Sequence, residues 1–231
     1  MAGDPYFNKV ALLMHMDDTL LRDVCGTAPI LTGGVARSAT QSMFGGYSAY
    51  FSGSGQYINI GGNGTALDVG SGDFTLEFFI YPTDVSSTRV LYLRRPAAAA
   101  QGIVLELEAS GVISVYIGDS NTSSFNVILT SAASTVLANQ WKHVAVVRSG
   151  TTFYLFYNGA IAAQTTATTF AVDDAGTIRI GAGDYGGDAF QGYMDELRMT
   201  VGFARYTSAF TPPSAAFVGK YFTLSGTVQD Y

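Results

Sequence analysis

Charged residues, cysteine and histidine are scarce in this chain of 231 residues. Aspartate, glutamate, lysine and arginine together make up 13% of the sequence, and the formal net charge is −6. A negative chain whose largest basic cluster is the Arg94–Arg95 pair lacks the positive surface that nucleic-acid binding requires. The single cysteine, Cys25, excludes an intramolecular disulfide and a zinc site made of several thiolates. Two histidines, His15 and His143, are too few for a three-histidine zinc site.

Long apolar runs are also missing. No apolar stretch approaches the ~18 residues that a membrane-spanning helix requires, so we expect no membrane insertion. Residues 1–18 contain neither the basic leader region nor the small-residue cleavage site of a secretory signal. We therefore expect a protein that is made in the cytoplasm and that stays there or leaves with a particle.

Short alternating segments separated by turn residues occupy most of the chain. Glycine occurs 27 times, and phenylalanine and tyrosine occur 15 and 14 times, a composition that suits many strands joined by tight turns. The pattern predicts an all-β fold in which two antiparallel sheets pack as a jelly-roll sandwich. A Ser-Gly-Ser-Gly turn predicts a hairpin between 47–51 and 56–60, and only 131–140 could form a helical turn. The predicted strands are 9–16, 47–51, 56–60, 73–81, 89–93, 103–107, 112–117, 124–129, 141–148, 152–157, 160–165, 177–180 and 191–200.

The last predicted strand contains the strongest chemical lead in the sequence. Strict alternation over 193–199 places Asp195 on the same face as Tyr193, Leu197 and Met199. A carboxylate buried on this more apolar face is costly unless a cation, a metal or a set of hydrogen-bond donors meets it. We therefore expect a partner for Asp195.

The segment FQGYMDELRMTVGFARYTSAFTPP (190–213) resembles the end of LamG-like domains, the laminin-G branch of the concanavalin A-like jelly rolls, in the form found in bacteriophage tail and surface proteins. Earlier segments are similar to the same family and follow in the same order. These are KVALLMHMDD, SMFGGYSAYFSGSGQYINI, GSGDFTLEFFIYP and QWKHVAVVRSGTTFYLFYNGAIAA. The resemblance implies a concanavalin A-like jelly roll over residues 1–213.

The residues after Pro213 lie outside this resemblance. We expect 214–231 to be a C-terminal extension, and SGTVQD near its end resembles the first strand of an Ig-like repeat. The extension is either the truncated start of a following Ig-like module or a terminal strand that pairs with residues 9–16.

Acidic residues near the first and last predicted strands indicate a candidate calcium site. Calcium binds about six to eight oxygen atoms from carboxylates, backbone carbonyls and water. A loop carrying Asp17, Asp18 and Asp23 beside Asp195 could supply such oxygens. The resemblance supports this hypothesis, because concanavalin A-like modules often carry a structural calcium ion between N-terminal residues and the closing strand. In the alternative, backbone amides or an arginine satisfy Asp195, and Asp17 and Asp18 only form a turn.

The glycine-rich segment IGAGDYGGDAF (180–190) is a candidate ligand-binding loop. A predicted strand follows it, so it does not match a phosphate-binding loop, which leads into a helix. Tyr185 between Asp184 and Asp188 offers an aromatic face and oxygen acceptors, a combination that suits a sugar. The alternative is a flexible connection that binds no ligand.

Patterns typical of catalytic residues are weak. Glycosidases place two carboxylates about 5–10 Å apart across the scissile bond. Sugar-cleaving members of the jelly-roll superfamily carry an E-x-D-x-E pattern, whereas Glu106 and Glu108 lack the intervening aspartate and the third acid. We expect solvent-facing glutamates, a hydrogen-bonded core histidine at His143, and no enzymatic activity.

The resemblance therefore implies a non-enzymatic carbohydrate-binding and adhesion module on the tail, fibre or capsid surface of a phage or virus particle, stabilised by calcium. The expected partner is a cell-surface glycan, and the expected location is the virion after synthesis in the host cytoplasm. Two alternatives remain open. One is a purely structural protein that decorates or assembles the virion through other virion proteins, and the other is a glycoside hydrolase.

Overall fold

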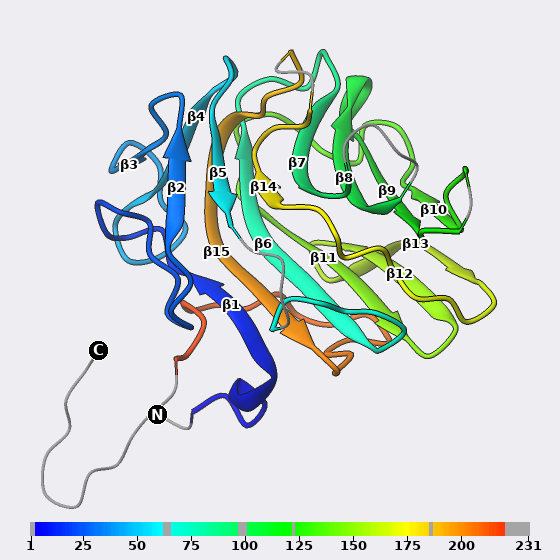
Figure 1. Cartoon of the computed structure of the whole chain (residues 1–231). Helices are drawn as coiled ribbons and strands as arrows, with labels where there is room; N and C mark the ends of the chain where they lie inside the picture. Colours follow the sequence, from blue (N-terminus) through cyan, green and yellow to red (C-terminus); the bar gives the residue numbers. More distant parts are fainter. Residues whose placement is uncertain (1–2, 62–65, 97–100, 122, 185–186, 220–231) are drawn as a thin grey trace, which may run out of the picture.

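The computed structural model describes residues 3–61, 66–96, 101–121, 123–184 and 187–219. In this part of the chain, two antiparallel sheets pack face to face and confirm the predicted all-β sandwich (Figure 1). Sheet A contains, in spatial order, β13 (Ala160–Thr166), β12 (Thr152–Tyr157), β11 (Lys142–Ser149), β6 (Phe74–Pro82), β15 (Gln191–Val201), β4 (Ser48–Ser52) and β3 (Ala36–Ser38), while β1 (Val10–Met14) also pairs with β15. Sheet B contains β10 (Val127–Thr130), β9 (Val112–Gly118), β8 (Gly102–Glu108), β7 (Arg89–Arg94), β14 (Ile178–Ile180), β5 (Tyr57–Ile60) and β2 (Pro29–Thr32).

The main hydrophobic core lies between the two sheets. Alternate side chains of each strand point into it, such as Phe78 and Ile80 from β6 and Leu105 and Leu107 from β8, and all four are fully buried. Helical structure in the described residues is limited to the short 3₁₀ turns Phe7–Lys9 and Ala109–Gly111. No helix in this part of the chain has the length and apolarity that a membrane span needs.

Two local predictions are wrong. The segments 47–51 and 56–60 do not form a hairpin, because β4 pairs with β15 and β3 in sheet A while β5 pairs with β14 and β2 in sheet B. The glycine-rich turn therefore crosses from one sheet to the other. The segment 131–140 contains turns and bends but no helix.

A β-bulge interrupts β15 directly after Asp195. The register between β15 and β6 shifts between Asp195 and Arg198, and Glu196 has a φ of 53°. As a result Leu197 and Met199 point into the core, whereas Asp195 lies opposite Phe79 on the outer face of sheet A. The prediction that Asp195 shares a face with Leu197 and Met199 is therefore wrong, because strict alternation assumed an uninterrupted strand.

The outer face of sheet A is buried by segments from both ends of the chain. Phe217 packs there against Leu13 and Phe79, together with Phe7 near the N-terminus and Phe44 from the loop before β4. A second apolar cluster joins Ala145, Val147 and Phe156 to residues of the segment after β15. Both faces of β6, β11 and β15 are consequently buried along most of their length.

A buried charge network also holds the segment after β15 against sheet A. The fully buried Glu77 carboxylate accepts hydrogen bonds from Arg198 Nε at 3.0 Å, His143 Nε2 at 3.1 Å and the Tyr206 hydroxyl at 2.9 Å. Burial raises the pKa of Glu77, but its hydrogen bond to His143 and the charge of Arg198 outweigh this effect and hold the pKa at about 2. His143 is thus the hydrogen-bonded core histidine that the sequence predicts.

The outer face of sheet B is left partly open. Several side chains that point away from the core on β5, β14, β8 and β9 are only half-buried, in contrast to most of those on β6, β11 and β15 of sheet A. They include Tyr57, Asn59, Arg179, Glu106 and Tyr116. This face, and the loop that runs from β14 to β15 beside it, can therefore contact a ligand from solution.

Candidate functional site

Asp195 is fully buried, and only one of its two carboxylate oxygens has hydrogen-bond partners among the described residues. Its Oδ2 accepts hydrogen bonds from the backbone amides of Met43 at 2.8 Å and Phe44 at 3.2 Å. Its Oδ1 has no hydrogen-bond partner among the described residues. Burial, together with the nearby carboxylates of Glu196 and Asp17, raises the pKa of Asp195 to about 7. Backbone amides therefore meet one oxygen of Asp195 and leave the other available.

Asp17 lies next to Asp195 and also has an available oxygen. Its Oδ1 is buried without a hydrogen-bond partner in the described part of the chain. Burial raises the pKa of this carboxyl group, and the neighbouring Asp18 adds to the effect. The backbone of Gly45 packs against the carboxylate so closely that a Cβ on Gly45 would lie 2.0 Å from Asp17 Oδ2. The structure thus brings Asp17 and Asp195 together beneath the loop before β4.

The other two predicted ligands have different roles. Asp18 is half-exposed, and its Oδ1 accepts hydrogen bonds from the backbone amides of Leu20 and Arg22 in a turn. Asp23 is buried, and its two oxygens accept hydrogen bonds from the amides of Leu13, Cys25 and Thr27. No group of three or more His, Cys, Asp or Glu residues suitable for a metal ion occurs within the described residues. The structure therefore assembles two of the four predicted aspartates.

A histidine and a glutamate border this pair of aspartates. His15 Nδ1 lies 2.9 Å from Glu196 Oε1, and Glu196 Oε2 accepts a hydrogen bond of 2.7 Å from the Phe217 amide. Burial lowers the pKa of His15, but the Glu196 carboxylate outweighs burial and raises the pKa overall. Glu196 is thus already satisfied, so the unpartnered oxygens in this region belong to Asp17 and Asp195.

The predicted ligand-binding loop follows β14, a central strand of sheet B. Asp184 connects two arginines that the sequence reasoning missed, accepting hydrogen bonds from Arg95 Nε at 3.0 Å and from Arg179 at 3.4 Å. Asp188 Oδ1 accepts a hydrogen bond of 3.1 Å from the Gly183 amide and so shapes the loop from within. The structure brings Asp184 and Asp188 into one loop, whereas Tyr185 lies outside the described residues.

Arg179 joins this loop to the open face of sheet B. Its guanidinium group lies 5.1 Å from the ring centre of Tyr57 and donates a hydrogen bond of 2.9 Å to the Gly183 carbonyl. The alternation of Ile178, Arg179 and Ile180 was the available sequence signal, since two buried isoleucines require an outward-facing arginine between them.

The centre of the open face combines apolar side chains with carboxylates. Val90, Leu93 and Val104 form a small apolar cluster next to the ring pair of Tyr116 and Phe125, whose centres lie 5.2 Å apart. Glu106 and Glu108 both point outward from β8 on this side, as the sequence predicts. Burial raises the pKa of Glu106, and the charges of Glu108 and Asp188 add to this effect. This face therefore offers apolar, aromatic, cationic and acidic groups within one surface.

Residues 52–201 match the family described as the concanavalin A-like lectin/glucanases superfamily. The chain belongs to this superfamily. Its sandwich and strand pairing agree with that membership, and the LamG-like resemblance of the sequence is confirmed. No curated protein sequence matches the chain.

Solved structures share the fold of this concanavalin A-like domain at low sequence identity. The binding domain of Paraclostridial Mosquitocidal Protein 1 has a TM-score of 0.68 at 14% identity, over 87% of this chain and 50% of that one. The botulinum neurotoxin serotype D ligand binding domain in complex with N-acetylneuraminic acid has a TM-score of 0.66 at 14% identity, over 89% and 49%. Domain 4 of AbnA, a GH43 extracellular arabinanase from Geobacillus stearothermophilus in complex with arabinotriose, has a TM-score of 0.58 at 14% identity, over 85% and 94%. The chain thus spans about half the length of the two toxin domains.

Proposed function

We propose that this concanavalin A-like domain is a non-enzymatic carbohydrate-binding module, and that it binds a glycan on the outer face of sheet B and the loop between β14 and β15. The main observation behind this proposal is the contrast between the outer faces of the two sheets. The chain's own ends bury the face of sheet A, whereas Tyr57, Arg179, Glu106 and Tyr116 remain half-buried on sheet B. The named ligands of two structures that share the fold, N-acetylneuraminic acid and arabinotriose, add support.

The chemistry of this face suits a sugar. Sugar hydroxyl groups need both donors and acceptors, and the guanidinium groups of Arg95 and Arg179 lie beside the carboxylates of Asp184 and Glu106. The Tyr116 ring provides an apolar surface on which the C–H groups of a sugar ring can pack. Because Glu106 and Arg179 lie on strands and Asp184 is hydrogen-bonded to Arg95 and Arg179, little side-chain ordering is required on binding.

A glycan array with matched variants tests the proposal. We expect the parent chain to bind a defined subset of glycans, and Glu106→Gln and Asp184→Asn to lower the affinity at least tenfold. Gln164→Ala on β13, an exposed position in the other sheet, serves as the control and should bind as the parent does. Tyr185→Ala tests the sequence prediction for the residue outside the described part. Binding to no glycan, or equal binding by all these variants, would refute the proposal.

Glycoside hydrolysis is the second candidate because of one observation, the raised pKa of Glu106. A carboxyl pKa above its ordinary value is one property that a general acid requires. This hypothesis predicts the release of reducing ends from a polysaccharide and the loss of that activity in Glu106→Gln. No release from any tested polysaccharide by the parent chain would remove it.

We further propose that Asp17 and Asp195 bind a calcium ion. Each contributes one buried oxygen without a partner, and carboxylate oxygen is the donor type that calcium prefers. Backbone carbonyls and water would have to complete the shell, since only two carboxylates are available there. When bound, the ion would supply positive charge to two carboxylates that burial otherwise drives toward protonation.

The biological setting remains a prediction. Adhesion by a phage or virus particle, and the alternative of a structural virion protein bound to other virion proteins, both rest on the resemblance of the sequence to phage tail and surface domains. If the parent chain binds a glycan and Asp184→Asn no longer binds it, the result favours adhesion over a purely structural role.

A further inference from the structure

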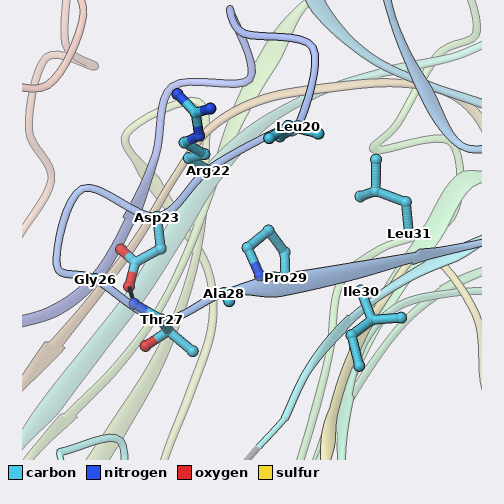
Figure 2. Close-up of a pocket in the computed structure, with 9 residues that line it drawn as sticks. All are labelled: Leu20, Arg22, Asp23, Gly26, Thr27, Ala28, Pro29, Ile30 and Leu31. Carbon is cyan, nitrogen blue, oxygen red and sulfur yellow. Dashed lines mark hydrogen bonds between the residues drawn. The ribbon is translucent and has the colours of Figure 1, made fainter.

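A groove lies between β2 and the loop that precedes it (Figure 2). Its volume is about 640 Å³, and its lining includes Leu20, Arg22, Ile30 and Leu31. Figure 2 shows Leu31 on the side of β2 where Leu20 and Arg22 lie, with Ile30 on the opposite side. Leu20 is 52% exposed and Ile30 is 61% exposed, values that leave two large apolar side chains in contact with solvent.

The groove runs along a free strand edge. β2 is the last strand of sheet B and pairs only with β5 in the described part of the chain. Every second residue of such a strand directs its backbone N–H and C=O groups away from the sheet. An extended segment that lay in the groove could pair with these groups and cover the exposed leucine in one step.

The end of the described chain lies beside this groove. Phe217 is buried on sheet A, and a Cβ on Gly219 would lie 3.8 Å from Cγ1 of Val24, in the loop that borders the groove. The described part of the chain therefore ends beside the loop that precedes β2. In the sequence of residues 220–231, Phe222 and Leu224 alternate with Thr223 and Ser225, the pattern of a strand with one apolar face.

The alternative pairing of this segment with residues 9–16 has no free edge available. One edge of β1 pairs with β15. At the other edge, the Leu13 carbonyl accepts a hydrogen bond from the Val24 amide at 2.7 Å, and the Leu13 amide donates to Asp23 Oδ1 at 2.8 Å. The chain's own loop thus occupies the edge that a terminal strand would need.

We propose that residues 221–228 bind in the groove as an additional strand beside β2, with Phe222 and Leu224 on the side of Leu20 and Leu31. Four residues of β2 offer an edge of about 13 Å, which a segment of this length can cover fully. Docking would cover the exposed side chain of Leu20. The docked segment would then replace β2 as the edge strand of sheet B. This inference is independent of the proposed carbohydrate function.

Hydrogen exchange of the full chain, compared with a chain that ends after Gly219, tests the docking. We expect the backbone amides of residues 30–32 to exchange at least tenfold faster in the shortened chain, because pairing and burial of the β2 edge are lost. Exchange in β6 and β11 should stay the same and shows that both chains are folded. Equal exchange of β2 in the two folded chains would overturn the proposal.

Two double variants of the full chain separate strand docking from a general effect of the tail. Phe222→Asp with Leu224→Asp should accelerate exchange in β2 as the truncation does, whereas Thr223→Asp with Ser225→Asp should leave it slow. Protection of β2 should also be equal at 1 µM and 100 µM protein. Protection that rises with concentration and persists in the shortened chain would assign the groove to a second copy and overturn the proposal, as would equal effects of the two double variants.

Discussion

Replacing Asp195 by asparagine separates a metal site from an ordinary buried acid. The substitution removes one negative charge and keeps an oxygen that can accept the hydrogen bonds from Met43 and Phe44. In the metal-free protein, burial raises the pKa of Asp195 from 3.8 to about 7. The folded state then binds this proton more tightly than the unfolded state. The contribution of Asp195 to the free energy of unfolding is therefore largest below about pH 4 and falls as the pH rises toward 7.

The magnitude follows from the pKa. At about 1.4 kcal/mol per pH unit, ionisation of Asp195 lowers the stability of the metal-free protein by at most about 4 kcal/mol at pH 8. Asp195→Asn removes this cost, so its melting temperature in EDTA should equal or exceed that of the parent. Calcium at about 100 times its dissociation constant would stabilise the parent by about 2.7 kcal/mol. For a chain of this size, that corresponds to a rise of roughly 5–10 °C in the melting temperature.

Melting curves at pH 8 in EDTA and in millimolar calcium provide the measurement. We expect the parent to show the rise with calcium and Asp195→Asn to show a shift below about 1 °C. Asp18→Asn is the matched control, because Asp18 hydrogen-bonds within a turn and should keep the calcium shift. Identical parent curves with and without calcium, together with no bound metal in elemental analysis, would refute the reasoning. Loss of the shift in Asp18→Asn would assign the ion to a different set of ligands.

Three further outcomes follow from the structure. Glu77→Gln should lower the free energy of unfolding by about 3–5 kcal/mol in urea titrations, because it removes the fully buried one of the two carboxylates that pair with Arg198 and leaves Asp4 alone to balance this charge. Since partner charges outweigh burial and hold the pKa of Glu77 at about 2, the parent should also lose stability as the pH falls from about 4.5 toward 2, and the variant should lose less. Gly45→Ala should lower the melting temperature and abolish the calcium shift, because its Cβ would meet the Asp17 carboxylate, whereas Gly46→Ala, which has a similar positive φ and open space, should keep the shift.

The sandwich could be predicted from sequence because its signal is repeated many times. Alternation in 73–81 and 141–148 recurs as β6 and β11 with small differences at their ends. β2 and β3 were missed because PILT and ARS lack the alternation of apolar and polar residues that marks a strand, whereas the equally short β14, IRI, has it. The turn between β4 and β5 was misread because a short glycine-rich segment has the same composition whether it joins strands of one sheet or crosses between two.

The candidate metal site shows a different limit of sequence reasoning. Asp195 was singled out correctly as a buried carboxylate, but its face was wrong because one bulge at Glu196 reverses the direction of the following side chains. The proximity of Asp17 to Asp195 depends on the pairing of β1 with β15 and on the close packing of Gly45, two long-range contacts. Asp18 and Asp23 accept hydrogen bonds from nearby backbone amides. The metal hypothesis had assigned the same carboxylate oxygens to calcium.

The location of the open face could not be predicted because it depends on where the ends of the chain pack. Both outer faces contain strand residues of similar polarity, and the sequence of β6 alone does not show that Phe217 and Phe44 cover it. Once those segments bury sheet A, Asp195 lies beneath them, whereas Asp184 and Glu106 lie on sheet B. A cation at Asp195 would therefore act on the attachment of the chain ends to sheet A. The groups proposed to bind sugar are held by hydrogen bonds and strand pairing that do not include Asp195, so stability and ligand affinity should respond separately to calcium.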